Sequence, residues 1–182
     1  QIHSDTVVST KTHKFHLETG ENYKIKGDET LLQQAIRALI ENATKYSEPH
    51  TNIYIKSFIK DGFGRISIRD EGVGISDEDA KRIFDRFYRV DLSRTKATGG
   101  TGLGLAIVKR IVEIHNGRIE INSKMNKGTE ISIVLPIGET DAAVSEETAK
   151  NVKKNKLEKK AVFSFLKKES EKENKRKNTR YR

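Results

Sequence analysis

The chain has 182 residues, of which 34% are hydrophobic and 34% charged, and this suits one compact domain with a polar extension. It contains no Cys, which excludes disulfides and thiolate metal sites and fits a reducing compartment. Residues 150–182 hold 14 Lys or Arg and 4 Asp or Glu, a net charge of +10, whereas the whole chain carries +9, so residues 1–149 come to −1. The basic pI therefore belongs to the C-terminal segment and does not by itself indicate a nucleic-acid binder.

The first elements are two short strands and a long helix. The β-rich segments Thr12 to Leu17 and Tyr23 to Lys26 are predicted as strands. Asp28 then caps a helix that we expect to run to about Tyr46. Apolar residues recur along one side of this helix with helical period, namely Leu31, Leu32, Ala35, Ile36, Leu39, Ile40 and Ala43.

A hairpin and an irregular region follow. Ile53 to Ile59 and Arg65 to Arg69 read as paired strands, with Asp61-Gly62 as the turn between them. Ser76 to Asp79 resembles a capping box that opens a short helix. Residues from about 85 to 101 lack a clear period and hold many Arg, Lys, Gly and Thr, so we expect a mobile loop there.

The last elements are a helix and two strands. The second strong helix runs from Leu103 to Ile114 and ends at Asn116-Gly117. The segments Arg118 to Asn122 and Thr129 to Leu135 are predicted as strands, and Pro136 closes the domain. This order favours an α/β two-layer sandwich, in which helices pack on one face of a mixed β-sheet.

We place the folded domain at residues 1–137 and expect residues 138–182 to form a basic, disordered tail, because that segment is rich in Lys, Asn and Glu. A few apolar tail residues fall on one face of a helix, namely Leu157, Ala161, Val162, Phe165 and Leu166. Such a basic amphipathic helix can lie on an anionic membrane or dock on a partner, and a solvated tail is the alternative.

The strand that ends at Asp70 points this residue to the same face as Ile66 and Ile68, because side chains alternate along a strand. A carboxylate on the core face needs a hydrogen-bond donor. The exocyclic amine of adenine is one such donor, and the backbone of the following turn is the alternative. Gly72 and Gly74 come next; they let the backbone approach a ligand closely or reach positive φ, although ordinary turns use the same residues.

A second glycine-rich turn, from Thr98 to Leu105, runs directly into a helix. Gly102 and Gly104 near the helix start each cost about 1 kcal/mol relative to Ala. Exposed N–H groups and the positive end of the helix dipole favour a phosphate site there. The spacing matches neither G-x-x-x-x-G-K-[ST] nor a strand-led G-x-G-x-x-G. A flexible hinge is the alternative interpretation.

The end of the first long helix offers further polar groups. Asn42 and Lys45 lie along one edge of the apolar stripe, and Tyr46 lies within it. The Asn42 amide oxygen suits Mg²⁺, which takes few protein oxygens and keeps several waters. Lys45 would pair with a phosphate and Tyr46 would pack on a base. The alternatives are an Asn near a helix end, a solvated Lys and a core Tyr.

These segments resemble, in order and spacing from about residue 12 to 136, sensor histidine kinases. Four of their motifs are present, the asparagine, first glycine, phenylalanine and second glycine boxes, at Leu39 to Ser47 (LIENATKYS), Asp70 to Ile75 (DEGVGI), Ile83 to Arg89 (IFDRFYR) and Gly99 to Lys109 (GGTGLGLAIVK). Gly128-Thr129 and Leu135-Pro136 match the usual closing strand. The resemblance implies the GHKL, or Bergerat-type, ATP-binding fold.

It also implies roles for individual residues in binding ATP and Mg²⁺. Asn42 would hold Mg²⁺, Lys45 would contact the phosphates, Tyr46 would flank the adenine and Asp70 would accept the adenine amine. The same end of the pocket would be shaped by Gly72, Gly74, Ile75 and Thr129. The phosphates would be covered by the second glycine box, with Gly100, Thr101, Gly102, Leu103, Gly104 and Leu105.

The resemblance assigns residues from about 85 to 101 to a lid over ATP. Phe84 and Phe87 would anchor this lid, and Arg86 or Arg89 would reach the γ-phosphate. Together with Asn42 and Lys45, these two arginines are the residues expected to serve catalysis. The reaction would transfer the γ-phosphoryl group to a histidine in two-component signal transduction.

One position departs from the family pattern. Many members carry a second Asn four residues before Asn42, where this chain has Ala38. The related gyrase-type, mismatch-repair and heat-shock ATPases, and the serine-kinase anti-sigma factors, carry a Glu there as general base. Ala38 cannot take a proton, which argues against those classes. Glu41 points away from the apolar stripe and is read as a solvated residue.

The phosphate-accepting histidine is expected elsewhere. None of the chain's histidines precedes a long amphipathic helix of the acceptor kind, and we expect all to be structural or exposed: His3, His13, His16, His50 and His115. The acceptor would lie on a dimerisation domain in a missing part of the protein or in its dimer mate, with a response regulator downstream and no nucleic acid. We expect this domain to be cytoplasmic and the full-length protein to be membrane-anchored.

Two other functions stay open from the sequence. The first is a non-catalytic sensor of the same fold that reports ATP to a partner, which the departure at Ala38 permits. The second is a nucleic-acid adaptor that acts through the tail, which would bind with a steep salt dependence.

Overall fold

The computed structural model describes residues 4–10, 12–90 and 101–138. Its strands are β1 (Ser4–Ser9), β2 (Lys14–Thr19), β3 (Asn52–Lys60), β4 (Phe63–Asp70), β5 (Arg118–Ser123) and β6 (Thr129–Pro136). Its helices are α1 (Glu29–Tyr46), α2 (Asp77–Ala80) and α3 (Gly104–Ile114). The predicted tail and its amphipathic segment lie outside the described residues, as does most of the predicted loop after residue 90.

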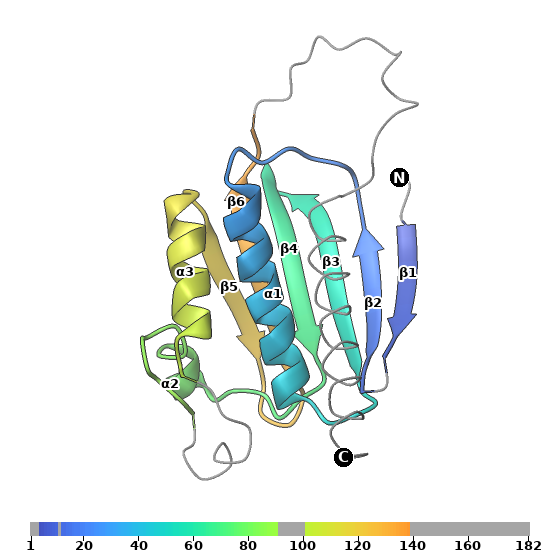
Figure 1. The fold of residues 1–182 in the computed structure, drawn as a ribbon, viewed down its shortest axis with the longest axis vertical. Helices are drawn as coiled ribbons and strands as arrows, with labels where there is room; N and C mark the ends of the chain where they lie inside the picture. Colours follow the sequence, from blue (N-terminus) through green and yellow to red (C-terminus); the bar gives the residue numbers. More distant parts are fainter. Residues whose placement is uncertain (1–3, 11, 91–100, 139–182) are drawn as a thin grey trace, which may run out of the picture.

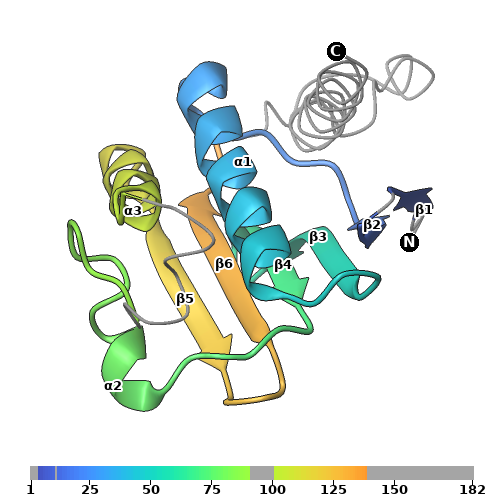
Figure 2. The ribbon, with the colours of Figure 1, turned by 60° about the horizontal axis from the view of Figure 1, so that its bottom comes forward.

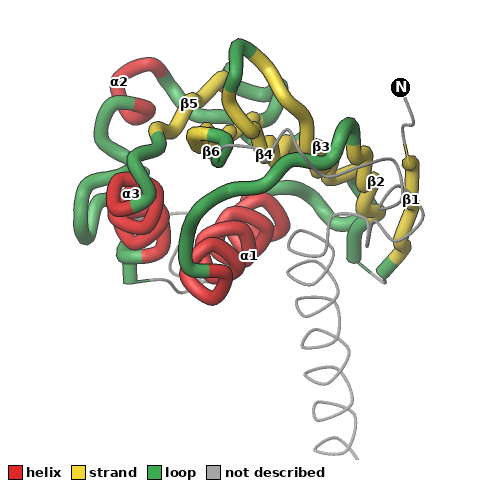
Figure 3. The backbone as a smooth tube through the Cα atoms, turned by 90° about the horizontal axis from the view of Figure 1, so that it is seen from above, coloured by secondary structure: helices red, strands yellow, loops and turns green. Residues whose placement is uncertain are grey.

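The strands form a six-stranded sheet in the order β1-β2-β3-β4-β6-β5. Strands β2 and β3 run parallel, and the other neighbouring pairs are antiparallel. Helices α1 and α3 lie side by side on one face of this sheet (Figures 1 and 3). The predicted two-layer α/β sandwich with a mixed sheet is therefore confirmed.

Helix α1 forms where its sequence predicts. Asp28 Oδ1 accepts hydrogen bonds from the N–H groups of Thr30 at 2.8 Å and Leu31 at 3.0 Å, which fixes the first turn. The predicted apolar stripe is buried except at Leu31, with Leu32, Ala35, Ile36, Leu39, Ile40 and Ala43 all below 6% exposure. Each fully buried Leu or Ile contributes about 1.5–3 kcal/mol, so this stripe holds α1 on the sheet.

In the N-terminal region one sequence prediction was wrong and one strand was not predicted. Tyr23 to Lys26 is extended but joins no strand. The Tyr23 ring lies over Gly64, and its hydroxyl donates to the Arg65 carbonyl at 3.1 Å, so the segment packs across the sheet instead of pairing with it. Strand β1 was missed because its polar sequence, SDTVVS, gives little alternation, and it forms by pairing along the edge of β2.

The described histidines are structural or exposed, as expected, and His3 lies outside the described residues. His13 and His115 are buried, His16 is half-buried and His50 is exposed. His115 joins the end of α3 to the start of α1: Nε2 accepts from the Asp28 N–H at 2.9 Å and Nδ1 lies 2.7 Å from the Ile111 carbonyl oxygen. The geometry therefore requires the neutral ring with the proton on Nδ1.

Candidate functional site

One end of the sandwich brings together segments that are far apart in the sequence. The last turn of α1, the end of β4, the start of α3 and the β5–β6 turn all meet there (Figures 1 and 2). They enclose a cavity of about 610 Å³, which is within the usual range of about 300–1,000 Å³ for small-molecule sites.

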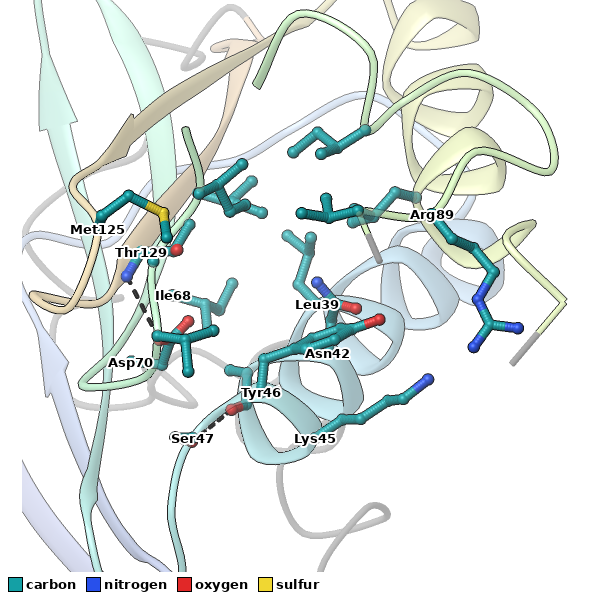
Figure 4. A pocket seen from close by; sticks show the side chains of 18 of the residues that line it. Leu39, Asn42, Lys45, Tyr46, Ser47, Ile68, Asp70, Arg89, Met125 and Thr129 are labelled. Atoms are coloured by element: carbon teal, nitrogen blue, oxygen red, sulfur yellow. Dashed lines mark hydrogen bonds between the residues drawn. The ribbon is translucent and has the colours of Figure 1, made fainter. Parts of the chain in front are cut away.

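The cavity unites most of the residues that the sequence singled out. Of the predicted site residues, its lining includes Asn42, Lys45, Tyr46, Asp70, Gly74, Ile75, Arg89, Leu105 and Thr129. Figure 4 shows Asp70 and Thr129 at one side of the cavity and Arg89 at the other, with the α1 side chains between them. The lining does not include Gly72, Arg86, Thr101, Gly102, Leu103 or Gly104, and Gly100 lies outside the described residues.

Asp70 is a buried carboxylate with one committed oxygen. Its Oδ1 accepts from the N–H groups of Gly72 at 2.8 Å and Thr129 at 3.3 Å. No described residue donates to Oδ2. Burial raises the pKa of the Asp70 carboxyl, and the N–H groups of Gly72 and Thr129 oppose that rise. One Asp70 oxygen thus holds the following turn, which was the alternative interpretation, and the other oxygen is left as an acceptor that a ligand can use.

The α1 residues line the middle of the cavity. Asn42 is half-buried, and its amide makes no hydrogen bond to the described residues. Tyr46 is 37% exposed, which contradicts the core-tyrosine alternative. The Lys45 ammonium lies 5.2 Å from the centre of the Tyr46 ring, a cation–π contact. Helix α1 is capped at Ser47, so Asn42 is not needed to end the helix.

The start of α3 faces the opposite side of the cavity. Leu103 occupies the N-cap position, and within the described residues no side chain caps the helix and its first turn holds no acidic residue. The neighbouring Leu105 lines the cavity. Uncapped N–H groups and the positive end of the helix dipole suit an anion.

The glycines of the first box are required by close backbone packing, and Gly74, which lines the cavity, has the positive φ (+71°) that the sequence indicated. A Cβ on Gly72 would overlap the Tyr46 carbonyl, and a Cβ on Gly74 would overlap the Lys124 carbonyl. The missing side chains therefore allow close packing of protein backbone, and no ligand is needed to explain them.

The two glycines at the start of α3 differ from each other. Gly102 has φ of +70°, and a Cβ there would lie 2.9 Å from the backbone of Phe87. Gly104 is helical, and a Cβ there would meet nothing within 4 Å. Packing thus explains Gly102, whereas Gly104 opens onto free space.

In the phenylalanine segment, Phe84 is held by its side chain and Phe87 by its backbone. Phe84 packs against the core, as expected for an anchor. Phe87 is 71% exposed with φ of +64°, and it is held by its N–H, which donates to the Gly102 carbonyl at 3.0 Å. The Tyr88 hydroxyl donates to Asp79 Oδ1 at 2.6 Å. Of the two predicted arginines, Arg89 lines the cavity and Arg86 is exposed outside it.

Some residues at the site carried no signal in the sequence. Met125 and Asn126 line the cavity from the β5–β6 turn. Ser123, at the end of β5, hydrogen-bonds to Thr129 behind the cavity wall. These residues sit in an ordinary turn sequence, and pairing of β5 with β6 is what brings them to the end of β4.

Comparison with known proteins identifies the family of the chain. Residues 27–139 match the family model described as histidine kinase-, DNA gyrase B-, and HSP90-like ATPase. The curated relative Sensor-like histidine kinase SenX3 of Mycolicibacterium smegmatis is 44% identical over 114 residues, which make up 63% of this chain and 30% of that protein. The chain spans less than a third of the length of the curated relatives it matches.

Solved structures show the same fold. The mycobacterial sensor histidine kinase MprB has a TM-score of 0.61 at 30% identity, with 70% of this chain and 84% of that chain covered. Full-length ShkA in complex with AMPPNP has a TM-score of 0.62 at 26% identity, with 71% and 27% covered. Among the described residues no helix is both long and apolar enough to span a membrane. The chain belongs to the family of histidine kinase-, DNA gyrase B- and HSP90-like ATPases, and its relatives there are sensor histidine kinases.

Proposed function

We propose that this chain is the catalytic domain of a sensor histidine kinase, which binds Mg-ATP in the cavity and donates the γ-phosphoryl group to a histidine on a separate dimerisation domain. The observation that carries the proposal is Asp70, a buried carboxylate whose Oδ2 has no donor among the described residues at one side of a nucleotide-sized cavity. The ATPase family match and the AMPPNP complex of the ShkA structure support a nucleotide as the ligand.

The polarity of the cavity gives ATP one favoured direction. The adenine would lie at the Asp70 and Thr129 side, with its amine on Asp70 and the apolar rim of Val73 and Met125 around the ring. The phosphates would point to Arg89 and the uncapped start of α3. This direction places the negative charge of ATP next to the positive groups of the site.

The residues present fit one magnesium ion. The Asn42 amide lies half-buried in the cavity wall without a hydrogen bond to the described residues, and its oxygen is the hard ligand that Mg²⁺ prefers. Bound there with the phosphate oxygens, Mg²⁺ would neutralise charge on the phosphates. Lys45, near the same wall, would add a second positive group.

Phosphoryl transfer asks the enzyme mainly for positioning and charge neutralisation. The bond between the γ-phosphorus and the bridging oxygen of ATP breaks, a bond from phosphorus to an imidazole nitrogen forms, and ADP leaves. Arg89 would stabilise charge on the transferred group. The acceptor imidazole would come from the dimerisation domain, and a response regulator would take the phosphoryl group next. We place this domain in the cytoplasm and the membrane anchor in another part of the protein.

The test separates a kinase from a non-catalytic ATP sensor, the function that Ala38 keeps open by removing one polar group a turn before Asn42. Residues 1–182 are expected to bind Mg-ATP in calorimetry and to take up no stable ³²P from labelled ATP. Adding the acceptor domain from the full-length protein should then give acid-labile label on that domain. Nucleotide binding without transfer to the acceptor would support the sensor, and stable label on residues 1–182 alone would contradict a separate acceptor.

A single methyl group tests the phosphate side. Gly104→Ala should raise the free energy of unfolding by about 0.5–1 kcal/mol, because Ala is the better helix former and its Cβ meets nothing. The same methyl should weaken ATP binding several-fold by crowding phosphates at the α3 start. Denaturant unfolding and calorimetry measure the two effects.

Gly102→Ala is the matched control for this variant. Its φ of +70° and the nearby Phe87 backbone should make it lose stability. An ATP affinity left unchanged by Gly104→Ala would show that the phosphates do not approach this helix.

A further inference from the structure

Ser123 stands behind the cavity wall with a filled hydrogen-bond shell. Its Oγ lies 2.8 Å from the Ile75 nitrogen, 3.1 Å from the Gly128 carbonyl oxygen and 2.8 Å from Thr129 Oγ1. A serine hydroxyl offers one donor and two acceptor positions. These three partners use all of them when Ser123 donates to Gly128 and accepts from Ile75 and Thr129.

This arrangement fixes the direction of the Thr129 hydroxyl. Its hydrogen points at Ser123, so Thr129 Oγ1 keeps only acceptor capacity for other groups. In the opposite arrangement Ser123 would donate to Thr129, and the Gly128 carbonyl would keep only the Lys124 N–H at 3.3 Å. The Thr129 hydrogen would then need a new acceptor. The first arrangement makes one more internal hydrogen bond and is favoured.

Thr129 and Asp70 lie side by side in the same wall of the cavity (Figure 4). The N–H of Thr129 and that of Gly72 are both used by Asp70 Oδ1. What remains for a ligand is a pair of acceptors, Asp70 Oδ2 and Thr129 Oγ1. Such a pair matches the 6-amino group of adenine, a donor, and opposes the 6-oxo group of hypoxanthine or guanine, an acceptor.

We propose that Ser123 is a positioning residue for base selection: by holding the Thr129 hydroxyl as an acceptor, it makes the site prefer 6-amino purines over 6-oxo purines. Ser123 does not line the cavity and acts through Thr129. This inference rests on the proposed function, because it assumes that the base of ATP lies at the Asp70 side.

The test compares ATP with ITP, whose base differs from adenine by the oxygen at position 6 and the hydrogen this places on N1. Without the Ser123 hydroxyl, the Thr129 hydroxyl can rotate and donate to that oxygen. In Ser123→Ala we therefore expect Mg-ATP to bind a few-fold more weakly and Mg-ITP to bind more tightly. The ratio of the two affinities, measured by calorimetry, should fall roughly tenfold, the worth of about one hydrogen bond.

The ratio of the ATP and ITP affinities separates a positioning role of Ser123 from a general destabilisation of the fold, because a destabilised fold lowers the affinity for both nucleotides alike. Ser123→Thr keeps the hydroxyl and should restore the ratio. Ser67→Ala removes another buried serine, hydrogen-bonded to Glu130 on β6, and should leave the ratio unchanged. If Ser123→Ala does not fold, Ser123→Cys fills the space with a weakly hydrogen-bonding thiol and should lower the ratio in the same direction.

The outcomes are distinguishable. A ratio that stays at the wild-type value in a folded Ser123 variant overturns the role of Ser123 and leaves the ATP site intact. Failure of the wild-type chain to bind ATP would instead contradict the proposed function.

Discussion

Asp70→Asn is expected to lower ATP affinity by about tenfold to a hundredfold, the usual worth of about 1.5–3 kcal/mol for a hydrogen bond to a charged group. In the variant the amide oxygen can still accept from Gly72 and Thr129. The amide nitrogen then replaces Oδ2 and presents hydrogens to the adenine amine, which is also a donor. Calorimetry with Mg-ATP measures the loss.

The same substitution should leave the free protein as stable at neutral pH, or more stable. Burial raises the pKa of Asp70 in the folded state, so folding disfavours the ionised carboxylate. For a raised pKa, the stability contribution is full below the unfolded pKa and is lost as pH rises through the folded pKa. Asn carries no charge and escapes this loss.

The pH dependence therefore provides an internal check on Asp70. Above the ordinary range of an aspartate, the gap in unfolding free energy between Asp70→Asn and wild type should widen with pH and then level off. Equal ATP affinity in wild type and Asp70→Asn would show that Asp70 does not contact the base.

Asn42→Ala is expected to remove the part of ATP affinity that depends on Mg²⁺. Even groups that only support a metal ligand usually change metal affinity about 10–100-fold when mutated, and Asn42 is proposed as the ligand itself. Calorimetry in Mg²⁺ and in EDTA should therefore give clearly different ATP affinities for wild type and nearly equal ones for the variant. The fold should be unharmed, because the Asn42 amide makes no hydrogen bond to the described residues and Ala favours helix.

Glu41→Ala is the control for this variant. Glu41 is the neighbouring residue of α1, is exposed and does not line the cavity, so its loss should leave the Mg²⁺ dependence of ATP binding intact. An Asn42 variant whose affinity in Mg²⁺ matches wild type would refute the assignment of the metal to this residue.

Local chemistry made much of the fold predictable. The Asp28 cap and the apolar stripe of α1 follow from neighbouring residues, as do the turn at Asp61-Gly62 and the helix start at Ser76. The site also showed in the sequence, because a carboxylate on the core face of a strand and glycines at a helix start are both costly without a partner. Hydrophobic periodicity and the energetic cost of a buried carboxylate or a helical glycine depend on residues close together in the sequence, so both can be recognised from the sequence alone.

The features that the sequence did not predict depend on distant neighbours. Strand β1 needs the edge of β2, and Tyr23 to Lys26 is kept out of the sheet by the Tyr23 ring over Gly64. The close packing of Gly72 against the Tyr46 carbonyl and of Gly74 against the Lys124 carbonyl also depends on residues distant in the sequence.

The sequence by itself determined most of the helices and strands and predicted most of the polar residues that gather around the cavity. The tertiary structure decided the position of each of these residues. One oxygen of Asp70 is hydrogen-bonded to the backbone and the other is not, Tyr46 faces the cavity, and Arg89 lines the cavity whereas Arg86 does not. It also brought Ser123 behind Thr129. The reason is physical, because a hydrogen bond or a close contact between two segments depends on the position of both, and only the packed sheet and helices set that position.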